Sequence, residues 1–212
     1  ATATPSLKPT MELTGSYGSY DTYNVGVNFS TGLLWNHLIF DGAYHESSTQ
    51  GFVHATDGRS GSYYGGLTWL GNNFQIRYKN IGNFEKTGQA WNGVLTSDYN
   101  PNGVFPNINS YKDLWNAGLG RVNTLVEDVV YDADAWAAGN YTVKPYLMRN
   151  GKKWDKTTDN FYQNHNILSF AWTPSEHWSH NMAIHYTYGQ GYYKELKVNT
   201  SLAKKFGMPE NK

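Results

Sequence analysis

Seven histidines are the first side chains in this sequence to consider for chemistry, because imidazole is the commonest protein metal ligand and a frequent general base. Four of them fall near the C-terminal end, at His165, His177, His180 and His185. His177 and His180 flank an expected turn, and His185 falls on the opposite strand face from His180. No spacing matches a ligand motif such as H-E-x-x-H. The sequence therefore predicts no metal site, and the simpler interpretation places these imidazoles in loops or on a water-facing wall.

Carboxylates are the next candidates, because glycoside hydrolysis needs two of them at a fixed separation. Asp41, Glu46, Glu85 and Asp98 are available, but nothing in the sequence holds any two of them at that separation. There is no G-x-S-x-G, no phosphate-binding loop and no dinucleotide fingerprint. The absence of cysteine excludes a cysteine nucleophile, a thiolate zinc site and a disulfide scaffold. We therefore expect a protein that is not an enzyme and that carries no cofactor.

Aromatic side chains offer binding chemistry instead, since the chain has 17 Tyr, 8 Trp and 9 Phe but only 16% charged residues. Lys plus Arg and Asp plus Glu balance at 17 each, which argues against a nucleic-acid partner. Flat rings beside hydrogen-bonding groups are typical of ligand sites. The predicted ligand-binding residues are Gln89, Trp91, Asn92, Trp115 and Arg121, with Trp136 and Trp154 as further aromatic candidates. The alternative interpretation is that these rings pack their own segment together.

The elements that must position these residues are strands, because apolar and polar residues alternate along most of the chain. In residues 23–30, Tyr23, Val25, Val27 and Phe29 share one face and smaller or polar residues the other. The same pattern recurs in six other stretches, which predicts an all-β, antiparallel up-and-down meander of about seven strands. Residues 1–81 hold five of these strands. Residues 161–212 hold two more and the start of the next extracellular loop.

Residues 82–160 break the alternation and form one long, partly structured loop, which we expect to be extracellular. Ser110 is a candidate N-cap for a short helix over residues 111–116. Residues 126–136 and 141–148 are predicted to pair as a hairpin.

The connections between strands alternate in length, and tryptophan recurs beside the short ones. Trp35, Trp69, Trp172 and Trp178 all lie next to short turns, and the last three fall on the apolar faces of their strands. A soluble sandwich also alternates apolar and polar residues, but its core has no reason to collect Trp at one rim. A transmembrane β-barrel combines short periplasmic turns, long outer loops and a membrane-interface girdle of aromatic residues. This combination favours a barrel, with those four tryptophans in the girdle.

Four stretches carry a family resemblance: "TPSLKPTMELTGSYGSYDTYN", "STGLLWNHLIFDGAYHESSTQGFV", "RSGSYYGGLTWLGNNFQIRYKNIGNFEKTGQAWNGV" and "TTDNFYQNHNILSFAWTPSEHWSHNMAIHYTYGQGYY". Together they resemble the N-terminal part of the barrel of a TonB-dependent outer-membrane receptor of the Bacteroidetes type. That resemblance implies energised uptake of a scarce nutrient, such as a ferric siderophore (iron uptake), haem, cobalamin or a glycan, in the bacterial outer membrane. It implies as partners the outer-membrane lipid, the nutrient ligand and the TonB complex.

The sequence departs from this family pattern in two ways, because it has no plug domain and too few strands to close a barrel of about 22 strands. We therefore expect a receptor fragment that needs the missing plug domain and the rest of the barrel, and that contacts TonB only through that absent plug. The alternative function is a secreted β-sandwich that binds carbohydrate through exposed Trp and Tyr.

Overall fold

The structure, a computed structural model, describes residues 5–91, 93–94, 105, 108–197 and 202–207. The chain divides into two compact units, which are described separately. The first unit comprises Ala1–Gly88 and Asp159–Tyr193, and the second comprises Gln89–Thr158 and Lys194–Lys212. The segment of residues 89–158 is therefore an insertion in the sequence of the first unit.

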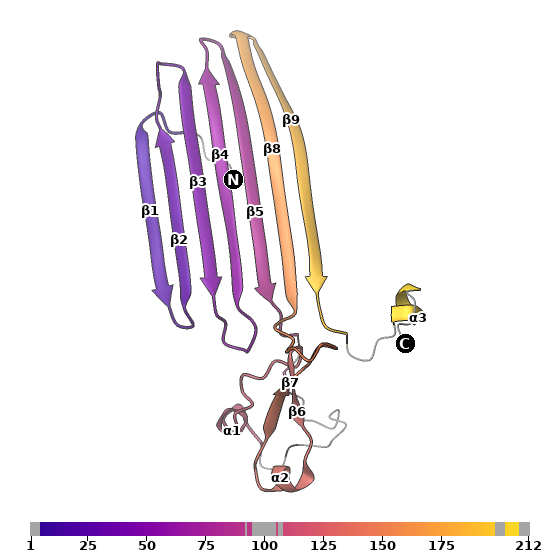
Figure 1. The fold of residues 1–212 in the computed structure, drawn as a ribbon. Coiled ribbons are helices and arrows are strands. Elements are labelled where there is room, and N and C mark those ends of the chain that lie inside the picture. Colours follow the sequence, from indigo (N-terminus) through magenta and orange to yellow (C-terminus); the bar gives the residue numbers. More distant parts are fainter. Residues whose placement is uncertain (1–4, 92, 95–104, 106–107, 198–201, 208–212) are drawn as a thin grey trace. The chain divides into compact units, whose positions relative to one another are not determined.

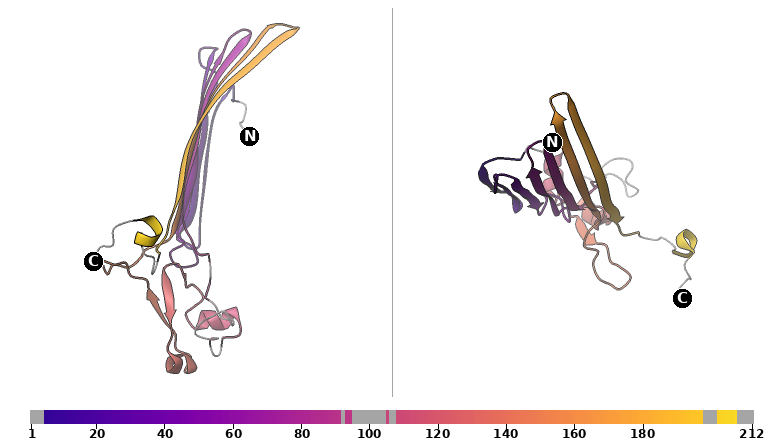
Figure 2. Two further views of the ribbon diagram at one scale, coloured as in Figure 1. Left: turned by 90° about the vertical axis from the view of Figure 1, so that its right-hand side faces the viewer. Right: turned by 90° about the horizontal axis from the view of Figure 1, so that it is seen from above.

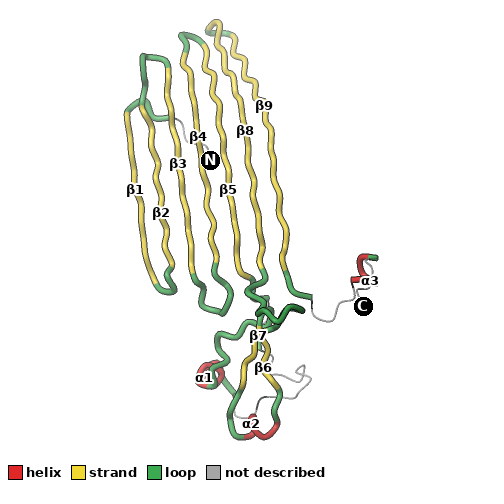
Figure 3. Tube along the Cα trace, viewed as in Figure 1, coloured by secondary structure: helices red, strands yellow, loops and turns green. Residues whose placement is uncertain are grey.

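The first unit is one antiparallel sheet with the strand order β1-β2-β3-β4-β5-β8-β9 (Figures 1 and 3). Its strands are β1 (Pro9–Gly18), β2 (Thr22–Thr31), β3 (Leu38–Thr49), β4 (Gly58–Leu70), β5 (Phe74–Gly88), β8 (Thr158–Ser175) and β9 (Trp178–Lys194). The strands follow one another across the sheet in the order in which they occur along the chain. The predicted all-β, seven-stranded antiparallel meander is therefore confirmed. The sheet is open, with β1 and β9 at its two edges.

Several strands are longer than the alternation indicates. β5 continues past residue 81 to Gly88, and β8 begins at Thr158 rather than 161. The extension of β5 comes from its pairing with β4, where Phe84 lies opposite Gly61 and Lys86 opposite Arg59. In the last hairpin Pro174 and Ser175 belong to β8, and the turn is Glu176–His177. Cross-strand hydrogen bonds extend a strand beyond the point where its own pattern becomes ambiguous.

The two ends of this sheet carry different connections. One end has the turns Gly32–His37, Gly71–Asn73 and Glu176–His177, and we call it the short-turn end. The other end has the Ser19–Asp21 turn, the longer Gln50–Asp57 loop and the link from β5 to β8. Figure 2 shows the sheet edge-on as a single twisted layer. A single layer has two faces, and among the described residues of this unit no second layer covers either of them.

Register assigns each side chain to a face, because directly paired residues point to the same side. One face, the aromatic face, carries mainly large apolar and aromatic side chains: Met11, Leu13, Tyr23, Val25, Phe29, Phe40, Tyr44, Tyr63, Leu67, Trp69, Ile76, Tyr78, Phe84, Leu168, Trp172, Met182 and Ile184. The other, the polar face, carries mainly polar and charged side chains: Glu12, Asn28, Asp41, His45, Tyr64, Thr68, Arg77, Lys79, His165, His185 and Thr187. The predicted two-faced strands are therefore present.

The second unit has short elements around an ordinary core. Its elements are α1 (Tyr111–Asn116), β6 (Glu127–Val130), α2 (Ala133–Ala137), β7 (Thr142–Pro145) and α3 (Leu202–Phe206). The predicted helix is confirmed, with Ser110 as its N-cap accepting from the Asp113 N–H. The predicted hairpin is confirmed in part, because β6 pairs with β7. Its first arm was predicted too long, since residues 133–136 belong to α2, which Asp132 caps through its side chain. Its core is a cluster of buried side chains: Phe105, Ile108, Leu119, Val122, Val129 and Trp136.

Across the described residues, no helix is long and apolar enough to cross a membrane.

Candidate functional site

Trp35 is the most unusual side chain of the first unit. It lies at the tip of the β2–β3 turn and is 80% exposed. Its φ is +47° and that of Asn36 is +63°, so both central residues of the turn are left-handed. Such turns favour Asn and Gly, and a left-handed conformation costs a residue like Trp about 1–2 kcal/mol. A strained, solvent-facing Trp suggests a role other than folding.

The other three predicted girdle tryptophans lie at the same short-turn end of the sheet. Trp69 is opposite Leu38 and stacks on His37, with ring centroids 5.3 Å apart. Trp172 and Trp178 stack on His180 from the two strands that flank the last turn, at 5.5 and 6.2 Å. All three remain substantially exposed. The structure thus places the four tryptophans along one rim.

Polar side chains on the aromatic face are hydrogen-bonded to one another across β4, β5 and β8. Asn164 donates to the Tyr63 hydroxyl at 2.8 Å and exchanges hydrogen bonds with Asn80 at 3.1 and 3.2 Å. Asn166 accepts from Asn80 at 2.9 Å and from the Tyr78 hydroxyl at 2.6 Å, and it donates to Asn164 at 2.7 Å. Such mutual pairing is what amides and phenols need where water is scarce.

Glu46 lies on the aromatic face, as Arg59 and Lys86 do, and its carboxylate is saturated with hydrogen bonds. Arg59 donates to it twice, from Nε at 2.8 Å and from a terminal nitrogen at 2.6 Å. The Tyr23 hydroxyl donates at 2.8 Å, and the Tyr44 hydroxyl donates to the other oxygen. The Arg59 guanidinium also lies 5.6 Å from the centre of the Phe84 ring. Four groups therefore donate to this carboxylate, two of them from the bidentate guanidinium, which is the arrangement of a strong, geometrically fixed ion pair.

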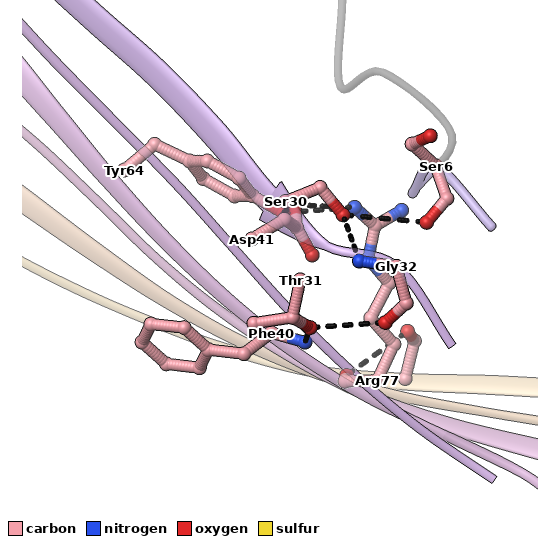
Figure 4. Close-up of polar contacts among 9 residues, drawn as sticks. Ser6, Ser30, Thr31, Gly32, Phe40, Asp41, Tyr64 and Arg77 are labelled. Atoms are coloured by element: carbon pink, nitrogen blue, oxygen red, sulfur yellow. Dashed lines mark hydrogen bonds and ion pairs between the residues drawn. The ribbon is translucent and has the colours of Figure 1, made fainter. Parts of the chain in front are cut away.

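The polar face holds a second charged cluster, in which Arg77 contacts both Asp41 and Tyr64 (Figure 4). An Arg77 terminal nitrogen lies 3.4 Å from Asp41 Oδ2 and donates to the Tyr64 hydroxyl at 2.8 Å. Tyr64 in turn donates to Asp41. Asp41 Oδ1 and the neighbouring Thr68 Oγ1 are buried and have no hydrogen-bond partner among the described residues. A buried oxygen without a hydrogen bond costs folding free energy, so this cluster is not fully satisfied.

A polar hollow of about 430 Å³ lies farther along the same face, toward the end with the longer loops. Thr14, Asn24, His45, Ser62, Asn83 and Glu85 contribute to its lining. Two of the carboxylates considered for hydrolysis, Glu46 and Glu85, are among the residues that line the hollow. Glu46 is bonded to Arg59 and Asp41 to Arg77, and Asp98 lies outside the described residues. The remaining lining side chains named here are suited to polar contacts.

The predicted ligand-binding residues belong to the second unit, and the structure brings two of them together. Trp91 Nε1 donates to Gln89 Oε1 at 3.3 Å, and Trp91 is 51% exposed. The Gln89 carbonyl accepts from Asn123 at 3.0 Å, which fixes the segment. Trp115 lies on α1 beside Gly120, 47% exposed, and a partly exposed Arg121 follows. Asn92 lies outside the described residues.

Trp136 and Trp154 are buried, as the packing interpretation predicts. Trp136 is only 3% exposed, donates to the Val130 carbonyl at 3.1 Å and lies 4.2 Å from the Phe105 ring. Trp154 is 8% exposed, with Lys194 Nζ 4.9 Å above its ring. Neither ring is available as a ligand platform.

No protein-family model, curated protein or solved structure matches this chain. Within the described residues there is also no group of three or more His, Cys, Asp or Glu side chains that could hold a metal ion. Function therefore has to be inferred from the chemistry of the two faces and of the second unit.

Proposed function

We propose that the seven-stranded sheet is a section of wall from a TonB-dependent outer-membrane receptor, with its aromatic face toward lipid and its polar face toward the lumen. In this proposal the inserted second unit is an extracellular ligand-capturing element. The complete receptor would take up a scarce nutrient with energy from TonB. The short-turn end would be periplasmic.

The observation that carries the proposal is the aromatic face itself. Met11, Leu13, Trp178, Met182 and Ile184 are each at least 60% exposed, and many other apolar side chains are partly so. Burying one such side chain is worth about 1.5–3 kcal/mol, against a total domain stability of about 5–15 kcal/mol. A sheet with this face in water would forgo more stabilisation than a typical domain has in total. Lipid or another apolar layer must cover it.

Hydrogen bonding within the face favours lipid as that layer. Asn80, Asn164, Asn166, Tyr63 and Tyr78 bond to one another, as polar groups must in a medium without water. The charged Glu46–Arg59 pair lies toward the end of the sheet opposite the Trp rim. A band bounded by tryptophans at one side and by a charged pair at the other fits a bilayer crossed by strands.

The open edges fit a section of wall as well. Every residue of β1 and β9 is exposed, and along one side of each no other strand of the described chain pairs with its backbone groups. Long edges of this kind promote aggregation unless another strand pairs with them. The remaining barrel strands would supply that pairing.

Bromolipid quenching of Trp fluorescence tests the proposal directly. The full chain is reconstituted in vesicles containing brominated lipid, and the quenched fraction is compared with that of Trp35→Phe, Trp178→Phe and Trp136→Phe. Loss of Trp35 or Trp178 is expected to reduce the quenched fraction, because bromine quenches only rings at bilayer depth. Trp136→Phe is the matched control, since that ring is inside a protein core. A chain that is a monodisperse monomer in plain buffer and shows no bromolipid quenching would refute the proposal.

Exposed Trp91 and Trp115 favour carbohydrate binding as the second candidate function, that of a secreted module. A glycan array probed with the chain, with Trp91→Ala and Trp115→Ala as controls, separates the two candidates. Sugar affinity in a detergent-free soluble chain, lost on either substitution, supports the module. Sugar affinity that requires detergent or lipid supports a glycan receptor.

A further inference from the structure

His165 and His185 meet on the polar face of β8 and β9, although 20 residues separate them in the sequence. His165 Nδ1 lies 3.3 Å from His185 Nε2, and the ring centres are 5.5 Å apart. Thr187 Oγ1 lies 2.9 Å from the His165 nitrogen and 2.8 Å from the His185 nitrogen. Three potential ligand or hydrogen-bonding atoms from two adjacent strands thus form one small triangle.

The separation of the two nitrogens matches a metal site. Zinc–nitrogen bonds are about 2.0–2.1 Å long, so two imidazoles on a tetrahedral ion have nitrogens roughly 3.3 Å apart. Imidazole nitrogens are good ligands for Zn²⁺, Cu²⁺ and Ni²⁺. We propose that His165 and His185 form a binding site for a divalent transition-metal ion on the polar face of the sheet.

Other described histidines are committed to different contacts. His37 Nδ1 bonds to the Leu70 carbonyl, and His45 Nε2 bonds to Asn28 at 2.9 Å. The His180 ring stacks with two tryptophans. His165 and His185 differ from these three because their nitrogens approach each other, with the Thr187 hydroxyl beside them. In this pair an ion can replace a long contact between two imidazoles by two strong bonds.

Two protein ligands leave the other coordination positions to water or to a donor atom of a bound molecule. An open site of this kind binds its ion reversibly and more weakly than a closed structural zinc site. Thr187 is a positioning residue, whose hydroxyl can hydrogen-bond an imidazole or a metal-bound water. The two histidines are brought together by the pairing of β8 with β9, whatever medium contacts the aromatic face. The metal-site proposal therefore does not depend on the sheet being in a membrane.

Titration of the untagged, folded full chain with Zn²⁺ alone tests the site, with calorimetry as the readout. We expect one ion per chain. His165→Ala and His185→Ala each weaken binding by at least about tenfold, and Thr187→Val weakens it by less. His45→Ala removes an imidazole from the same face outside the site and is expected to bind as tightly as the parent. His165→Asn and His185→Asn serve if an alanine variant fails to fold.

Cu²⁺ gives a second readout that identifies the ligands. Electron paramagnetic resonance is expected to show two imidazole nitrogens in the parent chain and one in each single variant. The proposal is overturned if the parent binds no ion at about 1 mM free Zn²⁺. It is also overturned if His165→Asn and His185→Asn bind as well as the parent, or if only a His177→Ala/His180→Ala double variant abolishes binding.

Discussion

Tryptophan is used in opposite ways in the two units of this protein. In the second unit Trp136 is 3% exposed and packs on Phe105 and Tyr141, as in any water-soluble core. In the first unit Trp35 is 80% exposed at the tip of a strained turn, and three more tryptophans line the same rim. The large buried apolar side chains of the described residues lie in the second unit, except for Ile39. The second unit buries its apolar side chains in a core, whereas the first leaves those of its aromatic face exposed.

The two faces of the sheet repeat this contrast on a smaller scale. On the aromatic face, the amides and phenols around Asn164 bond to one another. On the polar face, Asn28 bonds to Glu12 and His45 in exposed contacts. The contacts around Asn164 are partly buried, so water replaces a lost partner less readily there than around Asn28. The hydrogen bonds of the two faces thus differ in their access to water.

The largest expected effect is in the core of the second unit. Trp136→Ala removes a buried ring and the hydrogen bond to Val130, and it should destabilise that unit by about 3–5 kcal/mol. Hydrogen exchange of the β6–β7 amides measures the loss. Trp115→Ala, on an exposed ring, is the control and should cost less than about 1 kcal/mol. Similar losses from both substitutions would mean that Trp136 does not anchor a core.

A smaller loss of stability is expected from removing an amide, and it should differ between the two faces of the sheet. Asn164→Ala leaves Asn80 and Tyr63 each short of a partner, which costs about 1–3 kcal/mol where water cannot replace it. Asn28→Ala removes contacts to His45 and Glu12 on the polar face, where water can take over, and should cost about 0.5 kcal/mol or less. Chemical denaturation of the folded chain in vesicles measures both. Equal costs would show that both faces are equally wet.

Trp35→Asn tests whether a tryptophan of the rim contributes more to membrane binding than an exposed tryptophan of the second unit. Asn suits a left-handed turn better than Trp, so the substitution should not weaken the hairpin. Loss of an interfacial ring should nevertheless reduce vesicle partitioning about fivefold, equivalent to about 1 kcal/mol. Vesicle flotation measures the change. Trp91→Asn replaces another exposed ring, in the second unit, and is expected to leave vesicle partitioning unchanged. An equal loss of partitioning in both variants would show that the rim has no special role in membrane binding.

The smallest effect is a pH dependence at α1. The Ser110 hydroxyl and the Asn109 N–H, bonded to Asp113 at 2.8 and 3.1 Å, hold the pKa of that carboxyl below its usual range. Because the folded pKa is lowered, ionised Asp113 stabilises α1 fully above the unfolded value of about 3.9, and this contribution is lost as pH falls through the lowered value. Amide shifts of residues 111–116 report the change. Asp113→Asn should remove the pH dependence; if it persists, another group is responsible.

Much of the fold was predictable from local pattern. Alternation alone identified the seven strands and their two faces, because side chains on a strand have a period of two. The Ser110 cap and the β6–β7 hairpin were predictable for the same reason, since both depend on residues close in sequence. Strand ends were less accurate: β5 reaches Gly88 because β4 pairs with it there.

The predicted ligand-binding residues show that residue type alone does not predict which aromatic rings are exposed. The sequence offers no way to rank the four tryptophans of the second unit. In the structure Trp136 and Trp154 are buried, whereas Trp91 and Trp115 are about half exposed. Burial depends on what packs against a ring, here Phe105 against Trp136 and Lys194 over Trp154. Sequence spacing could not distinguish them.

By itself, then, the sequence determined the strands, the alternation of their faces and the tryptophans beside the short turns, because each is a property of neighbouring residues. The pairing of β5 with β8 joins strands on either side of the inserted second unit and was confirmed only by the structure. Only the tertiary structure decided which distant groups meet. The Asn80–Asn164 exchange, the Arg77–Asp41 pair and the His165–His185 contact each join different strands. Register between strands depends on pairing along their whole length, and one residue of slip would turn each of these side chains to the other face.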